Sequence, residues 1–343
     1  PADSDAPFRS WMCVLCGFVY DEAQGLPEDG IAPGTRWEDI PDTYPGSVLY
    51  AKPVEVIPHV FSAIGATAPP TYENAGHNNN LSFIITGDGV VVVNSGASWK
   101  LAEALHAEIR AVTDQPVKLV VNENGQGHSM LGNGYWAAQG VPILAHEDAV
   151  AEFEEDSAQG LAALKSYAKE NAEGTTVAIP TETFTDHKTI TMGEVTIEVL
   201  HLGPAHSPGD TQVWIPQWSM MIAGDIAFHE RLPPIFEGTC TLCWIETWET
   251  KFVPLNPTYV IPGHGHPTNL AQVTRYTRDY LVDLREKIGA HIEAGGDLAG
   301  AYYALARWQS EIANSTGDDA LRQQGFDTAR RGIALWKRLC DEY

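Results

Sequence analysis

The sequence predicts an α/β protein with a small N-terminal module and a C-terminal helical extension. Residues 1–57 are rich in Pro, Gly, Asp and aromatic residues and show no helical periodicity, which is typical of a module built of turns. From Leu81 onward, apolar β-branched runs alternate with a helical pattern, and from Asn269 the pattern is helical. We therefore expect a module at 1–57, an α/β domain at 58–268 and a helical extension of that domain at 269–343.

The first elements of the α/β domain are the clearest. Residues 81–96, LSFIITGDGVVVVNSG, are two apolar runs around a Gly-Asp-Gly turn, which predicts a hairpin. Residues 99–112, WKLAEALHAEIRAV, have apolar residues at helical spacing. Residues 116–125, PVKLVVNENG, predict a short buried strand that ends in a polar loop.

Later strands are expected where apolar runs end near His, Asp or Gly, because α/β proteins tend to place chemistry in such loops. The strands are expected within 140–146, 188–203 and 211–225. Helices are expected within 273–295, 299–313 and 326–343.

Composition excludes some partners. The chain has 343 residues, with 21 Lys and Arg against 45 Asp and Glu, a net charge of -24 that would repel nucleic acids and anionic lipid surfaces. We expect no membrane partner either, because no run reaches the roughly 20 apolar residues of a spanning helix. A signal-peptide core is also absent. The chain begins without Met, which leaves open a removed leader or tag, and we favour the cytoplasm over the periplasm.

Five cysteines form two Cys-x-x-Cys pairs and one single residue: Cys13, Cys16, Cys240, Cys243 and Cys340. This arrangement suggests a tetrathiolate metal site more than a disulfide framework. Cys340 lies in a terminal helical pattern and is expected to be a small buried hydrophobe.

Residues 11–41, WMCVLCGFVYDEAQGLPEDGIAPGTRWEDIP, resemble a rubredoxin. The resemblance rests on the Cys-x-x-Cys-Gly motif at 13–17, on Tyr20 and Asp21, and on the later segments DGI, PGT and WEDIP. It covers about the first 45 residues and then stops, because Gly46 and Leu49 stand where the cysteines of the second knuckle would be. The resemblance implies an iron site of which this segment supplies only half.

The second Cys-x-x-Cys pair offers the missing half. We hypothesise one rubredoxin-type iron held by Cys13, Cys16, Cys240 and Cys243, in a tetrahedral site split between the two modules. Two alternatives stay open: a structural zinc in the same four cysteines, or two separate pairs that are redox-active or reduced.

The region from about residue 58 resembles the metallo-β-lactamase superfamily. The resemblance is carried by GPAHSPGD at 203–210, AGD at 223–225 and PGHG at 262–265, together with the hairpin into VVVVNSG. It implies an αββα sandwich in which these loops supply a His ligand, a bridging Asp and a final His. By match, these residues are His206, Asp225 and His264.

The main signature of that family, His-x-His-x-Asp-His, is altered in this chain. An ungapped register places Asn124 and Gln126 at the first two His positions, His128 at the Asp and Ser129 at the last His. A one-residue shift would place His128 at the last His instead.

Neutral amides are weak zinc ligands, so an ordinary dizinc centre is doubtful. We expect a single iron, manganese or zinc ion at His128, His206, Asp225 and His264, with Glu123 as an extra carboxylate candidate. A two-metal centre that uses the amides and a metal-free relic stay open. Other residues near these loops are expected to be structural: His77, His201, His229, His266, Tyr72 and Trp244.

Cys240 follows Asp225 by fifteen positions, so the cysteine site should lie near the cleft. The leading hypothesis is an iron-dependent oxidoreductase in which the tetrathiolate iron passes electrons to the cleft metal, which acts on dioxygen or a small organic or sulfur compound. The alternatives are a zinc-dependent hydrolase of esters, lactones or phosphoesters with a structural four-cysteine site, and a non-catalytic electron-transfer protein. Expected partners are a small-molecule substrate, an electron-donor protein or reductase and a second copy in a homodimer.

Overall fold

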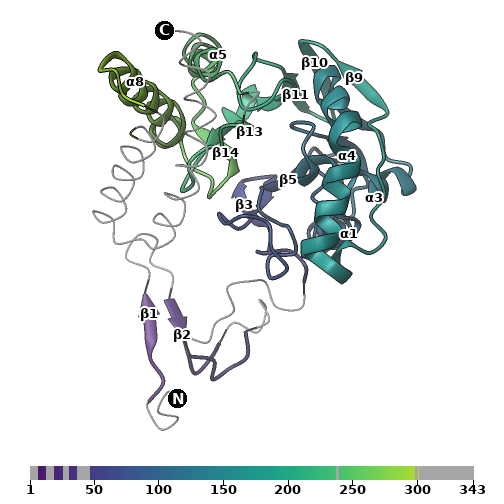
Figure 1. Ribbon diagram of the computed structural model, residues 1–343. Coiled ribbons are helices and arrows are strands. Elements are labelled where there is room, and N and C mark those ends of the chain that lie inside the picture. Colours follow the sequence, from purple (N-terminus) through teal and green to yellow (C-terminus); the bar gives the residue numbers. More distant parts are fainter. Residues whose placement is uncertain are drawn as a thin grey trace.

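A computed structural model describes residues 7–12, 19–25, 31–36, 47–236, 239–297 and 300. Two sheets face each other, and helices cover the outer face of each (Figure 1). The predicted αββα arrangement is confirmed. Among the described residues, no helix has both the length and the apolar character that crossing a membrane requires.

The first sheet has the order β3-β4-β5-β6-β7-β8-β9. Its strands are β3 (Val54–Ile57), β4 (Val60–Ala63), β5 (Leu81–Ile85), β6 (Val90–Val93), β7 (Val117–Val121), β8 (Ile143–His146) and β9 (Glu182–Phe184). Strands β5 and β6 pair antiparallel, as the Gly-Asp-Gly turn predicts, whereas β6, β7, β8 and β9 run parallel.

Helices on the outer face of the first sheet are α1 (Trp99–Val112), α2 (Gly127–Met130), α3 (Asn133–Ala138) and α4 (Glu147–Ala168), followed by the short η3 (Lys169–Ala172). Helix α1 matches its predicted bounds and begins at Ser98, whose side chain accepts a hydrogen bond from the backbone N–H of Leu101. Strand β6 alternates its side chains: Val92 packs against this helical layer and Val91 packs between the sheets.

The second sheet has the order β10-β11-β12-β13-β14. Its strands are β10 (His187–Met192), β11 (Val195–Leu200), β12 (Gln212–Ile215), β13 (Met220–Phe228) and β14 (Tyr259–His264), with the short η4 (Pro216–Trp218) before β13. Its outer face is covered by α5 (Thr241–Thr247), η5 (Trp248–Phe252), α6 (Val253–Leu255), α7 (Leu270–Thr274), η6 (Arg275–Asp279) and α8 (Tyr280–Glu293). The helices expected beyond residue 300 lie outside the described residues.

The N-terminal segment contributes β1 (Ser10–Met12) and β2 (Val19–Asp21), which pair antiparallel. Glu22 is buried beside them and accepts hydrogen bonds from Trp11 Nε1 (2.8 Å) and Arg36 Nη1 (3.0 Å). Figure 1 shows β1 and β2 apart from α5, at the opposite end of the view.

The segment Ser47–Tyr50 docks onto the α/β domain. The Leu49 side chain is 1% exposed and belongs to the core between the first sheet and α1. The backbone N–H of Tyr50 donates to His77 Nδ1 at 2.9 Å. The position where a rubredoxin carries a knuckle cysteine is therefore occupied here by a hydrophobic anchor.

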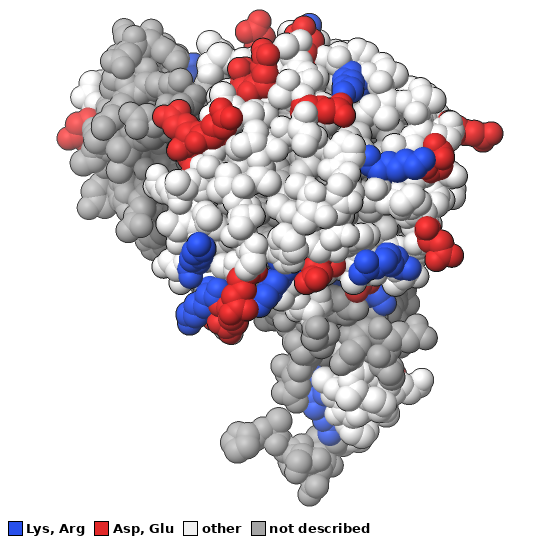
Figure 2. Space-filling view, turned by 90° about the vertical axis from the view of Figure 1, so that its right-hand side faces the viewer, with Lys and Arg blue, Asp and Glu red and all other residues white. Residues whose placement is uncertain are grey.

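Figure 2 shows the face that carries the helices of the first sheet. Acidic and basic side chains are interspersed there, and no continuous basic patch crosses the described part of this view.

Candidate metal centre

Four of the predicted site residues meet where the two sheets open at one edge. His128 stands on α2 after the β7 loop, and His206 lies in the loop between β11 and β12. Asp225 belongs to β13, and His264 ends β14, the parallel neighbour of β13. The fold therefore brings together residues that are up to 136 positions apart, counted as 264 minus 128.

Three of these residues form a tight cluster of metal-binding atoms. One donor atom from each of His128, Asp225 and His264 lies within 4.8 Å of the others. His128 Nε2 is 3.4 Å from Asp225 Oδ2, and His264 Nε2 is 3.3 Å from Asp225 Oδ1. The His206 Nε2 atom lies farther out, 3.7 Å from Asp225 Oδ2.

The donor atoms fit a metal ion because they are buried without hydrogen bonds. Asp225 and His264 are 1% and 2% exposed, and His128 Nε2, Asp225 Oδ1 and Glu123 Oε1 have no hydrogen-bond partner among the described residues. Buried polar atoms are normally satisfied, so convergent exceptions indicate an absent group. The Asp225 and Glu123 carboxylates supply the negative charge that a bound cation would balance.

Burial and the charges of neighbouring side chains shift the pKa values of the cluster residues. Burial alone would lower the pKa of His128, but the carboxylates of Asp225 and Glu123 raise it to about 10, so the metal-free cluster carries a proton on His128 that a bound metal ion would displace. Burial alone would raise the pKa of Asp225, but His264 and His128 hold it well below its usual range. Burial lowers the pKa of His206 and of His264 to about 4, so both imidazoles are neutral at pH 7 and can offer a lone pair.

Groups around the cluster orient its ligands. His264 Nδ1 hydrogen bonds to the backbone carbonyl of Asn78, which leaves Nε2 facing Asp225. The Phe228 ring stacks on His264, with ring centroids 5.2 Å apart. Asn124 Nδ2 donates to Asp225 Oδ2 at 3.1 Å. These contacts hold both side chains in place before any metal binds.

The two amides of the altered signature each contact a predicted ligand. Gln126 Nε2 lies 3.0 Å from His206 Nε2, the atom that would otherwise face a metal. Ser129 points away, because its Oγ donates to Asn94 Oδ1 at 2.8 Å. Gln126 thus takes up a polar contact on the His206 side, whereas Asn124 contacts Asp225 within the donor cluster.

Two glycines leave room for the carboxylates of Asp225 and Glu123 to pack against the backbone. A Cβ at Gly263 would lie 2.2 Å from Asp225 Oδ1, and a Cβ at Gly224 would lie 2.6 Å from Glu123 Oε2. Gly224 also has a φ of +63°, which disfavours other residues. Glu123 itself is 2% exposed, its Oε1 is 3.3 Å from His128 Nε2, and burial raises its pKa.

The described cysteines lie beside the cleft. Cys240 and Cys243 form a disulfide at the start of α5. Thr239 Oγ1 donates to the backbone carbonyl of His206 at 3.2 Å, and the Trp244 ring centroid is 5.6 Å from that of His206. A metal would require the reduced pair, because disulfide sulfurs are not thiolates.

The other half of the hypothesised cysteine site, Cys13 and Cys16, lies outside the described residues, as does Cys340. The flanking strands β1 and β2 stand apart from α5 in Figure 1.

Residues that the sequence assigned structural roles are placed as follows. Trp244 is buried and donates to the Ile226 carbonyl at 3.0 Å, and Tyr72 hydrogen bonds to Glu170 at the surface. The remaining histidines lie outside the donor cluster: His77 meets Tyr50, His201 stacks on His146, His229 hydrogen bonds to the His266 carbonyl, and His266 pairs with Glu230.

The donor cluster opens into a cleft of about 330 Å³. Its lining includes Tyr167 from α4 and Arg231 from the loop after β13. Arg231 Nη1 lies 2.9 Å from His264 Nδ1. Sequence reasoning missed both residues, and neither belongs to a motif that could have indicated a site.

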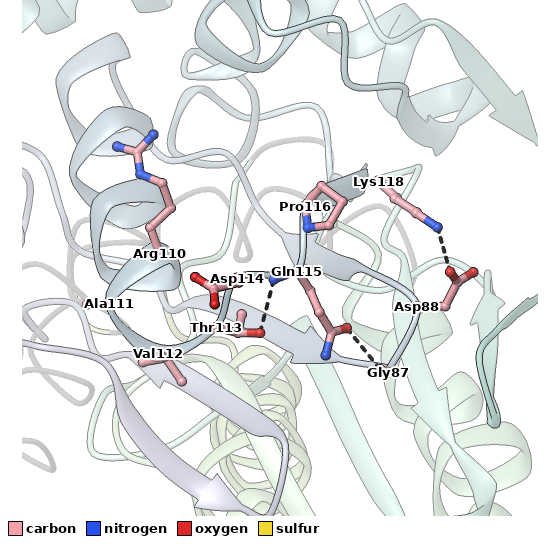
Figure 3. A pocket seen from close by; sticks show the side chains of 10 residues that line it. All are labelled: Gly87, Asp88, Arg110, Ala111, Val112, Thr113, Asp114, Gln115, Pro116 and Lys118. Atoms are coloured by element: carbon pink, nitrogen blue, oxygen red, sulfur yellow. Dashed lines mark hydrogen bonds and ion pairs between the residues drawn. The ribbon is translucent and has the colours of Figure 1, made fainter.

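A separate hollow lies at the C-terminal end of α1 (Figure 3). Several of its polar groups pair with each other: Lys118 with Asp88, and the Gln115 side chain with the backbone N–H groups of Gly87 and Gly89. The residues that line it include no cluster of buried donors, so we assign it no function.

A family model described as the metallo-beta-lactamase superfamily matches residues 75–287. The chain belongs to this superfamily. A metallo-beta-lactamase from Pontibacter korlensis has a similar fold, with a TM-score of 0.56 and 18% identity, covering 67% of this chain and 98% of that one. The DIM-1 metallo-beta-lactamase gives a TM-score of 0.53 and 16% identity, with 67% and 96% covered.

A rubredoxin family model matches residues 10–46. Rubredoxin-2 of Pseudomonas aeruginosa is 76% identical over 33 residues, which are 10% of this chain and 60% of that protein. The rubredoxin of Acinetobacter baylyi is 61% identical over 36 residues, 10% of this chain and 67% of that protein. This member of the superfamily therefore carries a rubredoxin-like segment that spans about two thirds or less of these relatives.

Proposed function

We propose that this chain is a metal-dependent oxidoreductase with a single metal ion at His128, Asp225 and His264. The observation that carries the proposal is the convergence of their buried donor atoms within 4.8 Å. Two imidazoles and one carboxylate with open positions are the ligand set of mononuclear non-haem iron enzymes, and manganese or zinc also accept these ligands. Glu123 and His206 stand beside this set as further ligand candidates.

The amide contacts favour one metal over two. In the ungapped register, Asn124 and Gln126 fall at two histidine positions of the superfamily signature, and they hydrogen bond to Asp225 and His206. Amides are poor ligands for zinc, so the His206 side lacks the set needed for a second ion. His206 is positioned to hold substrate or to adjust the first ion.

The chain's own residues prepare the cleft for redox chemistry. When bound, the metal would supply an open coordination position and one-electron chemistry. The Asn78 carbonyl fixes the orientation of His264, and Asn124 holds Asp225. The rings of Phe228 and Phe236 pack against the His206 ring. The cleft of 330 Å³ has room for dioxygen or a small organic or sulfur compound.

We further propose that a rubredoxin-type iron serves this centre, with Cys13, Cys16, Cys240 and Cys243 as ligands. The rubredoxin match supports the first pair. The contacts of Thr239 and Trp244 with His206 support the second, because they place Cys240 and Cys243 next to the cleft. The pairs would join within one chain or between two copies, and an electron-donor protein would reduce the iron.

A zinc-dependent hydrolase of esters, lactones or phosphoesters is the second candidate. The disulfide between Cys240 and Cys243 favours it, because an oxidised pair cannot hold iron and would act as a structural clamp. Catalysis would then need no reductant.

Metal analysis of protein purified without added metal, combined with visible absorption before and after dithionite, tests the proposal. We expect a red protein that bleaches on reduction and holds more iron than the cysteines can bind. His264→Ala should lose the additional metal, whereas His187→Ala, on the exposed side of β10, should keep it. Colourless protein with zinc, active without reductant, would support the hydrolase; rubredoxin-type iron without a second metal would reduce the role to electron transfer.

A further inference from the structure

The metal cleft contains one basic side chain beside its carboxylates, although the whole protein is strongly acidic. The net charge of the chain is -24, yet the one Lys or Arg among the described residues that line the cleft, Arg231, contacts the ligand His264 directly. The positive charge of Arg231 also helps to keep the imidazoles of His206 and His264 neutral. A guanidinium in a partly enclosed cleft is suited to recognise a carboxylate.

Tyr167 supplies a hydrogen-bond donor in the same cleft. Its hydroxyl approaches the loop at Gly76, where a Cβ would lie 2.9 Å from the hydroxyl oxygen. Burial raises the pKa of Tyr167 to about 12, so the phenol keeps its proton at pH 7 and can donate to an anion.

A larger chamber of about 840 Å³ adjoins the cleft. The two share a passage whose lining includes the apolar side chains of Leu131, Ala163 and Phe236 and the polar side chains of Gln126 and His206. Beyond this passage the described lining of the chamber includes Glu152 and Asp156 and no Lys or Arg. A ligand that reaches through the passage would meet apolar surface first and negative charge afterwards.

We propose that the cleft and chamber together bind an elongated organic monoanion, whose carboxylate lies between Arg231 and Tyr167 and whose apolar body extends past Leu131 and Phe236. This inference rests on the proposed function, because it names the substrate class of the same cleft. Glu152 and Asp156 give the selectivity for a single charge, since they would repel a second carboxylate at the far end of the ligand.

Calorimetric titration of the metal-free full chain tests this inference separately from the metal chemistry. The probes are butanoate, octanoate, octanamide, octylamine and octanedioate. Octanoate should bind at least tenfold more tightly than butanoate, because each buried methylene is worth about fourfold in affinity. Octanamide, octylamine and octanedioate should each bind at least tenfold more weakly than octanoate.

Variants locate the carboxylate. Tyr167→Phe and Arg231→Gln should each weaken octanoate binding about tenfold or more, because each removes a hydrogen bond to a charged group. Lys118→Gln is the matched control, since it removes a positive charge at the hollow of Figure 3, and it should leave binding unchanged. The Glu152→Gln variant should bring octanedioate closer to octanoate in affinity.

Equal binding of octanoate, octanamide and octylamine would overturn the proposal, as would Tyr167→Phe and Arg231→Gln proteins that bind octanoate like the Lys118→Gln protein. The metal content of the untreated protein is measured in parallel. A cleft that holds no metal but binds octanoate would refute the proposed catalytic centre and keep the monoanion site. A cleft that holds metal but binds all the probes alike would refute the monoanion site and keep the proposed catalytic centre.

Discussion

Replacing Leu49 by Ala tests whether the rubredoxin-like segment is anchored in the core of the α/β domain. The Leu49 side chain is 1% exposed and packs in the cluster that includes Leu81 and Leu101. Truncation of a buried leucine removes its burial and leaves a cavity, which together cost about 2–5 kcal/mol. At roughly 2–4 °C per kcal/mol for a domain of this size, the melting temperature should fall by about 4–20 °C.

The assay is thermal and guanidinium unfolding followed by tryptophan fluorescence, with Val54→Ala as the control. Val54 lies on β3 with 51% of its surface exposed, so its truncation should change stability by about 0.5 kcal/mol or less. Equal shifts for Leu49→Ala and Val54→Ala would refute the anchor. Leu49→Cys, which restores a cysteine at the rubredoxin position, should add no iron, because this side chain faces the core.

Three further predictions follow from the same contacts. Burial lowers the pKa of His77 from 6.5 to about 4 in the folded chain, so the unfolded chain takes up a proton at this residue at a higher pH than the folded chain does. The contribution of neutral His77 to the free energy of unfolding is therefore complete above pH 6.5 and is lost as the pH falls towards 4. The difference, about 2.5 pKa units, is on the order of 3 kcal/mol, and His77→Gln should remove it from unfolding curves between about pH 7 and 4.5. Mixing Cys13→Ser protein with Cys240→Ser protein should restore rubredoxin-type absorption if two copies complete the iron site, and size-exclusion chromatography would then show a dimer; a site within one chain predicts no recovery. The double variant Asn124→His and Gln126→His should bind one more metal ion per chain than the parent protein, and an unchanged stoichiometry would argue against the amides as the reason for a single metal.

Elements with strong local patterns were predictable from the sequence. Helix α1 carries its apolar stripe and a serine cap, and the β5–β6 hairpin has its Gly-Asp-Gly turn. Helix α4, at 147–168, was not predicted, because its buried residues are few and include Ala149 and Ser157 among many acidic neighbours. Its packing depends on contacts with α2 and β8 that no local window contains.

The cleft was predictable only where ligands sit in recognisable loops. His206, Asp225 and His264 stand in such loops, whereas the register around His128 depended on which side chains turn towards Asp225. Tertiary contacts determine which side chain turns towards Asp225, because Ser129 hydrogen bonds to Asn94 at the end of the neighbouring strand. Arg231 and Tyr167 carry no local signal, because their proximity results from the packing of α4 over the cleft.

The Leu49 anchor and helix α5 together give a physical reason for an iron site that is divided between the rubredoxin-like segment and the α/β domain. Tyr50 binds His77 on the loop that also carries Asn78, the residue whose carbonyl orients His264. Thr239, next to Cys240, binds the backbone of His206. The segment that follows the first half and the residue that precedes the second half therefore each contact a loop that holds or orients a cleft ligand. Iron held by only two thiolates is weakly bound, so filling all four positions would require the halves to meet. The free energy of completing the iron site would then act on both loops that hold the cleft ligands, and removing iron should weaken metal binding at His264 and His206 together.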